Sequence, residues 1–376
     1  MKALVVSYTK MKGFGGGVFA ARSTVNAVAE VCDGVTLLFP ADKPYERDPE
    51  VHPSVRQIGV TDSSPKLIKL FHVLSRGVMH RYLAPFGDLL DRERFDLVVF
   101  HNSKGSRRLV CKAREHGAKV VTVHDNYEYE YTKDNFHWYE LLWMLPITVK
   151  GEREAVQGSD LNLVLSVQDR DLLRNRYDPD RRARFEVLGV FEYNDRPLPE
   201  LREPVQENVF AITGNLGTRQ TLDSLLPWLD KYWPVIRNRI PDSRLLVAGK
   251  NPSVDLKKRL RAVGAELVDS PADMDEILRQ ARYYVCPTCK GGGVKLRVMD
   301  GLRFGLPCLV HEISARGYEP FRDRNLFAYD CPESFRNALE SMLDSSVDRT
   351  LALEAYSAKM TFCAGVSRMK RFLSGL

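Results

Sequence analysis

Residues 291–307 of the sequence, GGGVKLRVMDGLRFGLP, combine bare backbone with two cations and a carboxylate. Lys295 and Arg297 follow three glycines, and Asp300 lies three residues beyond Arg297. Glycines let backbone N–H groups approach an anion closely, and a helix start adds partial positive charge. An arginine fork suits a phosphate, and a carboxylate can accept hydrogen bonds from ribose hydroxyls. These residues suit a nucleotide phosphate, but a glycine-rich connection before an amphipathic helix with solvated cations explains them as well.

The elements around this segment would bring its polar residues together. The run YYVCP before the glycines is typical of a strand, and residues 294–304 have the pattern of a helix. Val294, Val298 and Leu302 are about one turn apart and would face the sheet. Arg297 and Asp300 would then face one ligand. The glycines of the loop are Gly291, Gly292 and Gly293.

The rest of the chain alternates short β-branched runs with helix-like sequence. Runs that are apolar on both faces and separated by helices indicate a parallel sheet covered on both sides. The charged stretch 192–208, which contains three prolines, interrupts this alternation, and the pattern then resumes. We therefore expect an α/β fold of two Rossmann-like, doubly wound domains that bind ligand at the carboxyl ends of their strands.

Composition limits the class of protein. The 376 residues carry a net charge of +6 with a pI near 8.8, which fits anionic ligands or an anionic membrane surface better than it requires nucleic acid. Seven cysteines do not form a disulfide pattern, and Cys286 and Cys289 lack the second ligand pair of a zinc site. There is no signal peptide or membrane span, so we expect a cytoplasmic protein.

The second half of the sequence resembles retaining glycosyltransferases of family 4 (glycosyl transferases group 1). The resemblance covers residues 208–320, from ITGNLG through DMDEILRQARYYVCP and the glycine loop to RGYE. Those enzymes have the GT-B fold, in which two Rossmann-like domains face each other across a cleft. The resemblance implies an acceptor-binding domain at 1–195, a nucleotide-sugar domain at 205–345, and a last segment, 346–376, that returns to the first domain.

The resemblance also implies roles for individual residues. Arg297 matches the phosphate-binding cation, Asp300 matches the ribose carboxylate, and the backbone at Gly317 and Tyr318 matches a second diphosphate-binding turn. The sequence departs from the family at two places. Many members have a glutamate where this chain has Gly292, and the nearest cation after the first strand of the domain is Arg219, with no lysine following it.

A second glycine-rich loop, KGFGGG, follows the first predicted strand. The loop contains Gly13, Gly15, Gly16 and Gly17. It does not complete the dinucleotide fingerprint G-x-G-x-x-G, because the position after Gly17 is Val18 and not the last glycine of the motif. A nicotinamide oxidoreductase is therefore the weakest interpretation. The resemblance implies a loop that faces the donor phosphates, whereas a tight turn that only packs strand against helix is the simpler alternative.

Polar residues also follow two later strands of the first domain. His124 and Asp125 end one strand, and Glu128 follows shortly. An imidazole at a strand end can bind a sugar hydroxyl, and His124 matches the histidine that the family has near the donor sugar. Asp125 and Glu128 are acceptor-side candidates. His101 and its neighbour Asn102 also end a strand and rank lower.

Residues 65–83 have the pattern of a basic amphipathic helix. One side carries an apolar stripe that begins with Leu67, Phe71 and Leu74, and the other carries Lys66, Lys69, Arg76 and His80. Such a helix either packs its stripe onto its own sheet, which is the simpler interpretation, or lies on an anionic bilayer. The second interpretation would make the protein a peripheral one on the inner face of the plasma membrane.

Together these features predict a metal-independent glycosyltransferase of hexosyltransferase type. It would move a sugar from a nucleotide-diphosphate sugar to a sugar or lipid-linked acceptor in surface polysaccharide or glycolipid assembly, without a cofactor. The alternatives are an inactive nucleotide-binding partner subunit of a glycosyltransferase complex and a GT-B sugar-nucleotide epimerase. The predicted catalytic residues are His124, Arg297 and Asp300, and the acceptor-binding ones are Asp125 and Glu128. The predicted donor-binding residues are Gly16, Gly17, Gly214, Arg219, Gly291, Gly292, Gly293, Lys295, Gly317 and Tyr318.

Overall fold

The structure, a computed structural model, divides the chain into two compact units. One comprises residues 1–196 with 361–376, and the other comprises residues 197–360. The predicted start of the second domain at residue 205, and Pro204 of the predicted linker, lie outside the described residues. The described residues are 1–13, 15–104, 106–201, 208–322 and 324–376.

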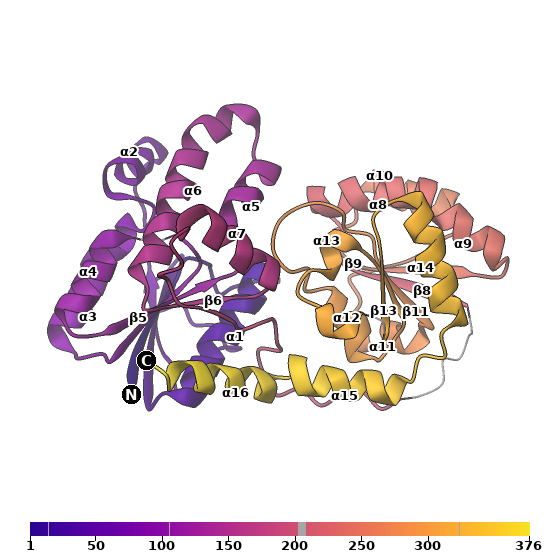
Figure 1. Cartoon of the computed structure of the whole chain (residues 1–376). Helices are drawn as coiled ribbons and strands as arrows, with labels where there is room; N and C mark the ends of the chain where they lie inside the picture. The colour runs from indigo at the N-terminus through magenta and orange to yellow at the C-terminus, as the bar shows by residue number, and fades with distance from the viewer. Residues whose placement is uncertain (14, 105, 202–207, 323) are drawn as a thin grey trace. The chain divides into compact units, whose positions relative to one another are not determined.

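The first unit is built on a seven-stranded parallel sheet with strand order β3-β2-β1-β4-β5-β6-β7 (Figure 1). The order reverses between β1 and β4, which is the point where doubly wound sheets bind ligands. The strands are β1 Lys2–Ser7, β2 Gly34–Pro40, β3 Arg56–Val60, β4 Leu97–His101, β5 Lys119–His124, β6 Leu161–Val164 and β7 Phe185–Val187.

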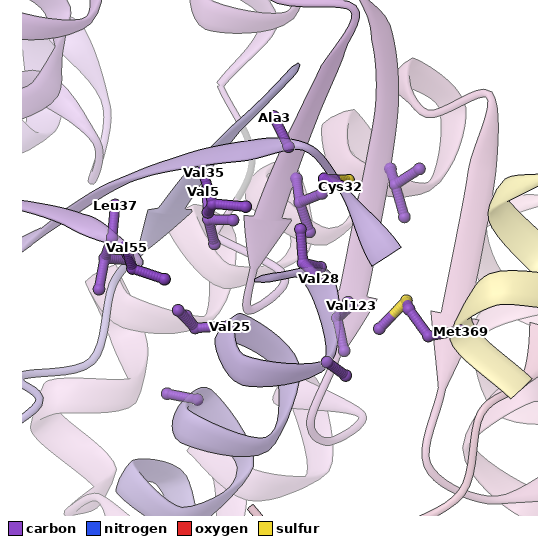
Figure 2. Close-up of a cluster of buried hydrophobic side chains, with 14 of the residues drawn as sticks. Ala3, Val5, Val25, Val28, Cys32, Val35, Leu37, Val55, Val123 and Met369 are labelled. Carbon is purple, nitrogen blue, oxygen red and sulfur yellow. The ribbon is translucent and has the colours of Figure 1, made fainter. Parts of the chain in front are cut away.

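Helices cover both faces of this sheet because its strands are apolar on both sides. Ala3 and Val5 of β1 belong to the cluster formed with α1 and α16, and Leu4 and Val6 belong to the cluster formed with α3 and α4. Figure 2 shows part of the first cluster, which joins Val5 to side chains of α1 and to Met369 of α16. The helices are α1 Gly16–Val31, α2 Lys66–Arg76, η1 His80–Tyr82, α3 Leu83–Arg92, α4 Arg107–Glu115, α5 Glu128–Asn135, α6 Trp138–Gly158, α7 Val167–Tyr177 and α16 Phe362–Leu373.

The second unit repeats the same topology on six parallel strands in the order β10-β9-β8-β11-β12-β13, with the reversal between β8 and β11. The strands are β8 Val209–Asn215, β9 Arg244–Lys250, β10 Glu266–Asp269, β11 Tyr283–Cys286, β12 Cys308–His311 and β13 Leu326–Tyr329. The helices are α8 Arg219–Lys231, α9 Trp233–Arg239, α10 Val254–Ala262, α11 Met274–Gln280, α12 Val298–Arg303, α13 Glu312–Ala315, η2 Glu319–Phe321, α14 Pro332–Asp344 and α15 Arg349–Met360. Two doubly wound parallel sheets confirm the predicted fold class.

The end of the chain is shared between the two units. Helix α15 packs against α12 of the second unit, where Arg349 donates a hydrogen bond to the carbonyl of Phe304 at 3.1 Å. Helix α16 packs against α1 of the first unit, and Gly365 lies so close to Phe191 that an added Cβ would meet the ring at 2.0 Å. The division therefore falls at Thr361, later than residue 346, because the apolar face of α15 is buried in the second unit.

The predicted amphipathic helix at 65–83 is shorter than expected. Helix α2 ends at Arg76 because Gly77 has a φ of +89°, outside the helical region. Leu67, Phe71 and Leu74 are exposed, so the interpretation that this stripe packs onto its own sheet is wrong for these residues. The side chain of Lys66 lies outside the described residues. No helix in the described part of the chain is long and apolar enough to cross a bilayer.

Candidate functional site

The glycine loop of the second unit follows β11 and folds around the side chain of Lys295. The Lys295 ammonium donates to the carbonyls of Gly291, Gly292 and Gly293 at 2.6, 2.7 and 3.1 Å. Since a trans peptide points its N–H away from the preceding C=O, the next amides along the loop face away from the ammonium. No described residue accepts a hydrogen bond from the amides of Gly292 or Gly293. Lys295 therefore shapes the loop from inside.

The helix after this loop begins later than residue 294, where the sequence pattern places it. Lys295 and Arg297 lie in turns, and α12 spans only Val298–Arg303. The inward direction of Lys295 explains the difference. Its side chain donates to the carbonyls of the loop, so it does not lie on the exposed face of a helix. A helix this short adds little dipole, so charge recognition rests on the side chain of Arg297 and the loop amides.

Arg297 lies at the reversal of strand order, between the ends of β8 and β11. Its Nη2 donates to the hydroxyl of Thr221 at 3.0 Å, and its Nη1 is buried with no acceptor among the described residues. The guanidinium lies against Gly214, where a Cβ would meet its Cζ at 3.0 Å. Gly214 also has a φ of +132°, which disfavours other residues. A partly buried cation with one buried, unsatisfied donor atom is suited to an anionic ligand.

Asp300 is held toward the same strand end by a chain of hydrogen bonds. Thr213 donates to Oδ2 of Asp300 at 2.6 Å, and the hydroxyls of Thr213 and Tyr284 lie 2.8 Å apart. Burial raises the pKa of Tyr284 well above its usual value, so its hydroxyl stays protonated and donates to the carbonyl of Arg297 at 2.6 Å. The arrangement places the Asp300 carboxylate and the Arg297 guanidinium at one end of β8.

The remaining predicted donor residues of the second unit have different surroundings. Tyr318 is fully buried, and its hydroxyl donates to the carbonyl of Lys295 at 3.1 Å. The amide of Gly317 donates to Glu319 at 3.1 Å, so an anion at this turn would replace that carboxylate. Arg219 begins α8 with an exposed side chain, 3.8 Å from Asp223. Among the predicted donor residues that the structure describes, Lys295 contacts the loop glycines and Tyr318, while Arg297 contacts Gly214 and Asp300.

In the first unit, the glycine loop leads into α1. Gly15 is the residue before the helix, and Gly16 and Gly17 form its first turn, which contains no acidic residue. An added Cβ at Gly17 would be 3.7 Å from Thr9, which is an ordinary contact, so this glycine is not required by close packing. Their place beside β1 puts them at the reversal point of the first sheet.

His124 ends β5 as predicted, but its ring is fully buried. Its Nδ1 is paired with the hydroxyl of Ser103, and its Nε2 lies 2.9 Å from the amide oxygen of Asn162. Burial lowers the pKa of His124 to about 4, so the ring is neutral at physiological pH. Both ring nitrogens are engaged within the unit, and a catalytic role for His124 stays a prediction.

We expect His124 to make stability depend on pH. A histidine whose folded pKa is about 4, against 6.5 unfolded, stabilises the protein above pH 6.5 and loses that contribution as the pH falls toward 4. The loss amounts to about 3 kcal/mol over that range. Denaturant unfolding at several pH values should show this extra slope for the wild type and not for His124→Gln. Parallel profiles for the two proteins would contradict the assignment.

Asp125 forms a buried cluster with the last residue of β4 and the residue after it. His101 Nε2 lies 2.9 Å from Oδ1 of Asp125, and the amide of Asn102 donates to Oδ2 at 3.1 Å. Asn102 has a φ of +92°, a conformation that Asn adopts more readily than most residues and that clusters at functional sites. His101 and Asn102, the lower-ranked pair, are therefore drawn into the same group as Asp125.

Glu128 is buried at the start of α5 and pairs with a lysine. Lys104 donates to Oε2 of Glu128 at 2.5 Å. Burial alone would lower the pKa of Lys104, but the attraction of Glu128 outweighs it and the pKa lies above its usual value. Glu152 accepts from the amide of Glu128 at 2.6 Å and from the hydroxyl of Tyr177 at 2.7 Å, and burial raises the pKa of Glu152 to about 7.

Sequence reasoning missed the residues that hold the predicted ones in place. Thr213 and Asp300 are 87 positions apart, and Thr221 and Arg297 are 76 positions apart, so spacing does not reveal either contact. One signal was present: Thr218 caps α8 by accepting from the amide of Thr221, a helix start that follows a strand ending in Thr-Gly-Asn. Within the described residues, no group of three or more His, Cys, Asp and Glu side chains is arranged to hold a metal ion.

Two family models match the chain and together span most of it. Residues 14–188 match the model described as Glycosyltransferase Family 4, and residues 173–345 match the model described as Glycosyl transferases group 1. No curated protein is a significant match to the sequence.

Several solved structures are similar over the full length. Sucrose-phosphate synthase from Thermosynechococcus elongatus is 15% identical with a TM-score of 0.72, covering 100% of this chain and 99% of its own. WaaG, a glycosyltransferase involved in lipopolysaccharide biosynthesis, is 17% identical with a TM-score of 0.66, and both chains are covered completely. Anabaena Alr3699/HepE in complex with UDP is 12% identical with a TM-score of 0.68 and the same complete coverage. At these identities the similarity shows the fold, which is GT-B.

Proposed function

Because the chain belongs to the glycosyltransferases that combine a family 4 domain with a group 1 domain, we propose that it moves a sugar from a nucleotide-diphosphate sugar to an acceptor hydroxyl. The observation that carries the proposal is the buried, unsatisfied Nη1 of Arg297 at the reversal point of the second sheet. A phosphate oxygen would complete the donor set of this arginine. The HepE neighbour was solved with UDP, which agrees with a nucleotide ligand for this fold.

The residues around Arg297 suggest how the leaving group is stabilised. Negative charge grows on the diphosphate as its bond to the sugar breaks, and a fixed guanidinium with loop amides directed outward would stabilise that charge. Asp300, held by Thr213, would bind the ribose hydroxyls of the donor. These side chains would do the work that a metal ion does in other transferases, so we propose a metal-independent hexosyl transfer without a cofactor.

We further propose that the reaction retains the configuration of the transferred sugar. Gly292 offers no carboxylate nucleophile at the position where many relatives have a glutamate. The acceptor oxygen would therefore bond to the anomeric carbon on the face that the diphosphate leaves, and the departing phosphate oxygen would take the acceptor proton. The amide of Gly317 would contribute on the donor side by exchanging Glu319 for the ligand, whereas the amide of Tyr318 already donates to the carbonyl of Ala315.

The surface of the first unit suggests where in the cell the reaction takes place. Exposed apolar side chains on α2 and a net charge of +6 suit a peripheral protein on an anionic leaflet. We propose a cytoplasmic enzyme at the inner face of the plasma membrane, acting in surface polysaccharide or glycolipid assembly. Asp125 and Glu128 would lie on the acceptor side.

The first test is a thermal-shift panel of nucleoside diphosphates and their sugars, followed by an assay of nucleotide release. We expect one base to raise the melting temperature selectively, since a ligand at about 100 times its Kd adds about 2.7 kcal/mol to stability. Nucleotide release that is slow in the absence of acceptor and faster after an acceptor extract is added would then show turnover. Binding without turnover in any acceptor mixture would favour a partner subunit, and no shift with any nucleotide would refute the proposal.

A further inference from the structure

The first unit contains a cavity of about 210 Å³ that no predicted site accounts for. It lies between α2 and α6, which Figure 1 shows close together at one end of the unit. Its volume is below the ~300–1,000 Å³ of pockets that enclose a whole small molecule, so it fits only part of a ligand.

The wall of the cavity is mostly apolar, and its polar side chains are Tyr8 beyond β1, Ser103 and Lys104 beyond β4, and Thr148 of α6. Val73 and Val78 come from the region of α2, and Trp143, Met144 and Ile147 come from α6. Ser103 and Lys104 follow β4, beside the reversal point of the sheet. The Lys104 ammonium lies 5.6 Å from the centre of the Tyr8 ring and donates to Glu128. A ligand with an apolar chain and a polar head group matches this distribution of apolar and polar side chains.

The pairing of Lys104 with Glu128 indicates what kind of polar end fits. The two opposite charges cancel, so the pair does not attract a net anion as a lone lysine would. An ammonium beside a carboxylate offers donors and acceptors together, which is what sugar hydroxyls require. Among the described residues, the ammonium makes its one hydrogen bond to Glu128, which leaves capacity for a ligand.

The surface around the cavity is also apolar. Leu67 and Phe71 on α2 are 82% and 65% exposed, and Trp138 and Leu142 on α6 are 76% and 73% exposed. Large apolar side chains gathered on two neighbouring helices mark a surface that contacts lipid or protein. Two tryptophans and a tyrosine at the start of α6 have the composition of a membrane interface.

We propose that the cavity between α2 and α6 binds the apolar chain of an amphipathic acceptor whose hydroxyl-bearing head contacts Lys104 and Glu128. The inference rests on the proposed glycosyl transfer and names its acceptor as a glycolipid or lipid-linked sugar. The cavity gives the acceptor a fixed place in the first unit, because the chain is held between two helices while the head reaches the strand ends that carry Asp125 and His124.

Binding of n-octyl β-D-glucopyranoside below its micelle concentration tests the proposal on the full-length protein by titration calorimetry. We expect saturable binding to the wild type and none of D-glucose, which has the head without the chain. Ile147→Trp, which fills the cavity, should weaken binding at least tenfold. Arg153→Trp, a change to the same residue at an exposed position of the same helix outside the cavity lining, should bind as the wild type does. Val78→Trp provides a second filling variant if Ile147→Trp fails to fold.

Three outcomes would overturn the inference. These are absence of octyl glucoside binding, equal binding by the filling variants, and a wild-type dimer in light scattering that octyl glucoside does not dissociate, which would make the apolar face a contact between copies of the chain. Nucleotide-induced thermal shifts of the same variants separate this inference from the proposed function. A failed nucleotide shift with intact octyl glucoside binding would count against the function, and the reverse would count only against the cavity.

Discussion

Arg297→Ala is expected to remove the nucleotide-dependent thermal shift and to lower turnover by about 100-fold or more. Loss of one donor that stabilises developing charge costs about 10²–10³ in turnover in other enzymes. The effect should be large because Arg297 is held by Thr221 and Gly214 with a buried Nη1 that has no acceptor among the described residues and is left for the ligand. Calorimetric binding of the nucleotide and single-turnover kinetics would measure the two losses separately.

Two control variants make this prediction specific. Arg297→Lys keeps the charge but not the fork, so we expect an intermediate loss. Arg219→Ala removes an exposed cation that is 77% accessible and only 3.8 Å from Asp223, so its effect should be several-fold smaller than that of Arg297→Ala. Near-normal binding and turnover in Arg297→Ala would refute the assigned phosphate site.

Gly249→Ala, a substitution in the strand next to β8, should also lower nucleotide affinity at the Arg297 site. Gly249 of β9 pairs with Gly214 of β8, and an added Cβ would lie 1.8 Å from the Gly214 carbonyl oxygen. The two strands would have to separate at this pair, at a cost of about 1–3 kcal/mol. Since Gly214 lies against the guanidinium of Arg297, nucleotide affinity should fall at least tenfold along with stability.

The matched control is Gly34→Ala in β2. A Cβ there would be 3.9 Å from Lys2, an ordinary contact, so we expect stability to change by less than about 0.5 kcal/mol. Chemical denaturation and nucleotide calorimetry on both variants would test the comparison. Wild-type stability and affinity in Gly249→Ala would show that strand separation at this pair does not control the site.

The fold could be predicted from the sequence because its signals are local and repeated. Alternating strand and helix patterns of both halves predict two doubly wound parallel sheets, and the structure confirms them. The packing partner of α15 was not predictable in this way. Its amphipathic pattern shows that one face is buried, but not that the face packs on α12 while α16 packs on α1.

The site was predictable at the level of residue type and less so at the level of geometry. The run from Gly291 to Asp300 shows which residues gather after β11, but not that the ammonium of Lys295 turns back to the loop carbonyls. The partners of His124 likewise come from β6 and from the end of β4, and only folding brings them together. Tertiary contacts of this kind leave no trace in sequence spacing.

The three carbonyls around the Lys295 ammonium resemble the oxygen ring of a crown ether around a cation. A chelated loop of this kind has already lost its conformational entropy during folding, so a ligand that binds its outward amides does not have to order it. The ammonium of Lys295 thus occupies the position inside the loop that a bound cation would take. In the proposed function, a nucleotide would bind a surface whose conformation is already fixed, so the entropic cost of ordering the loop falls on folding and not on binding.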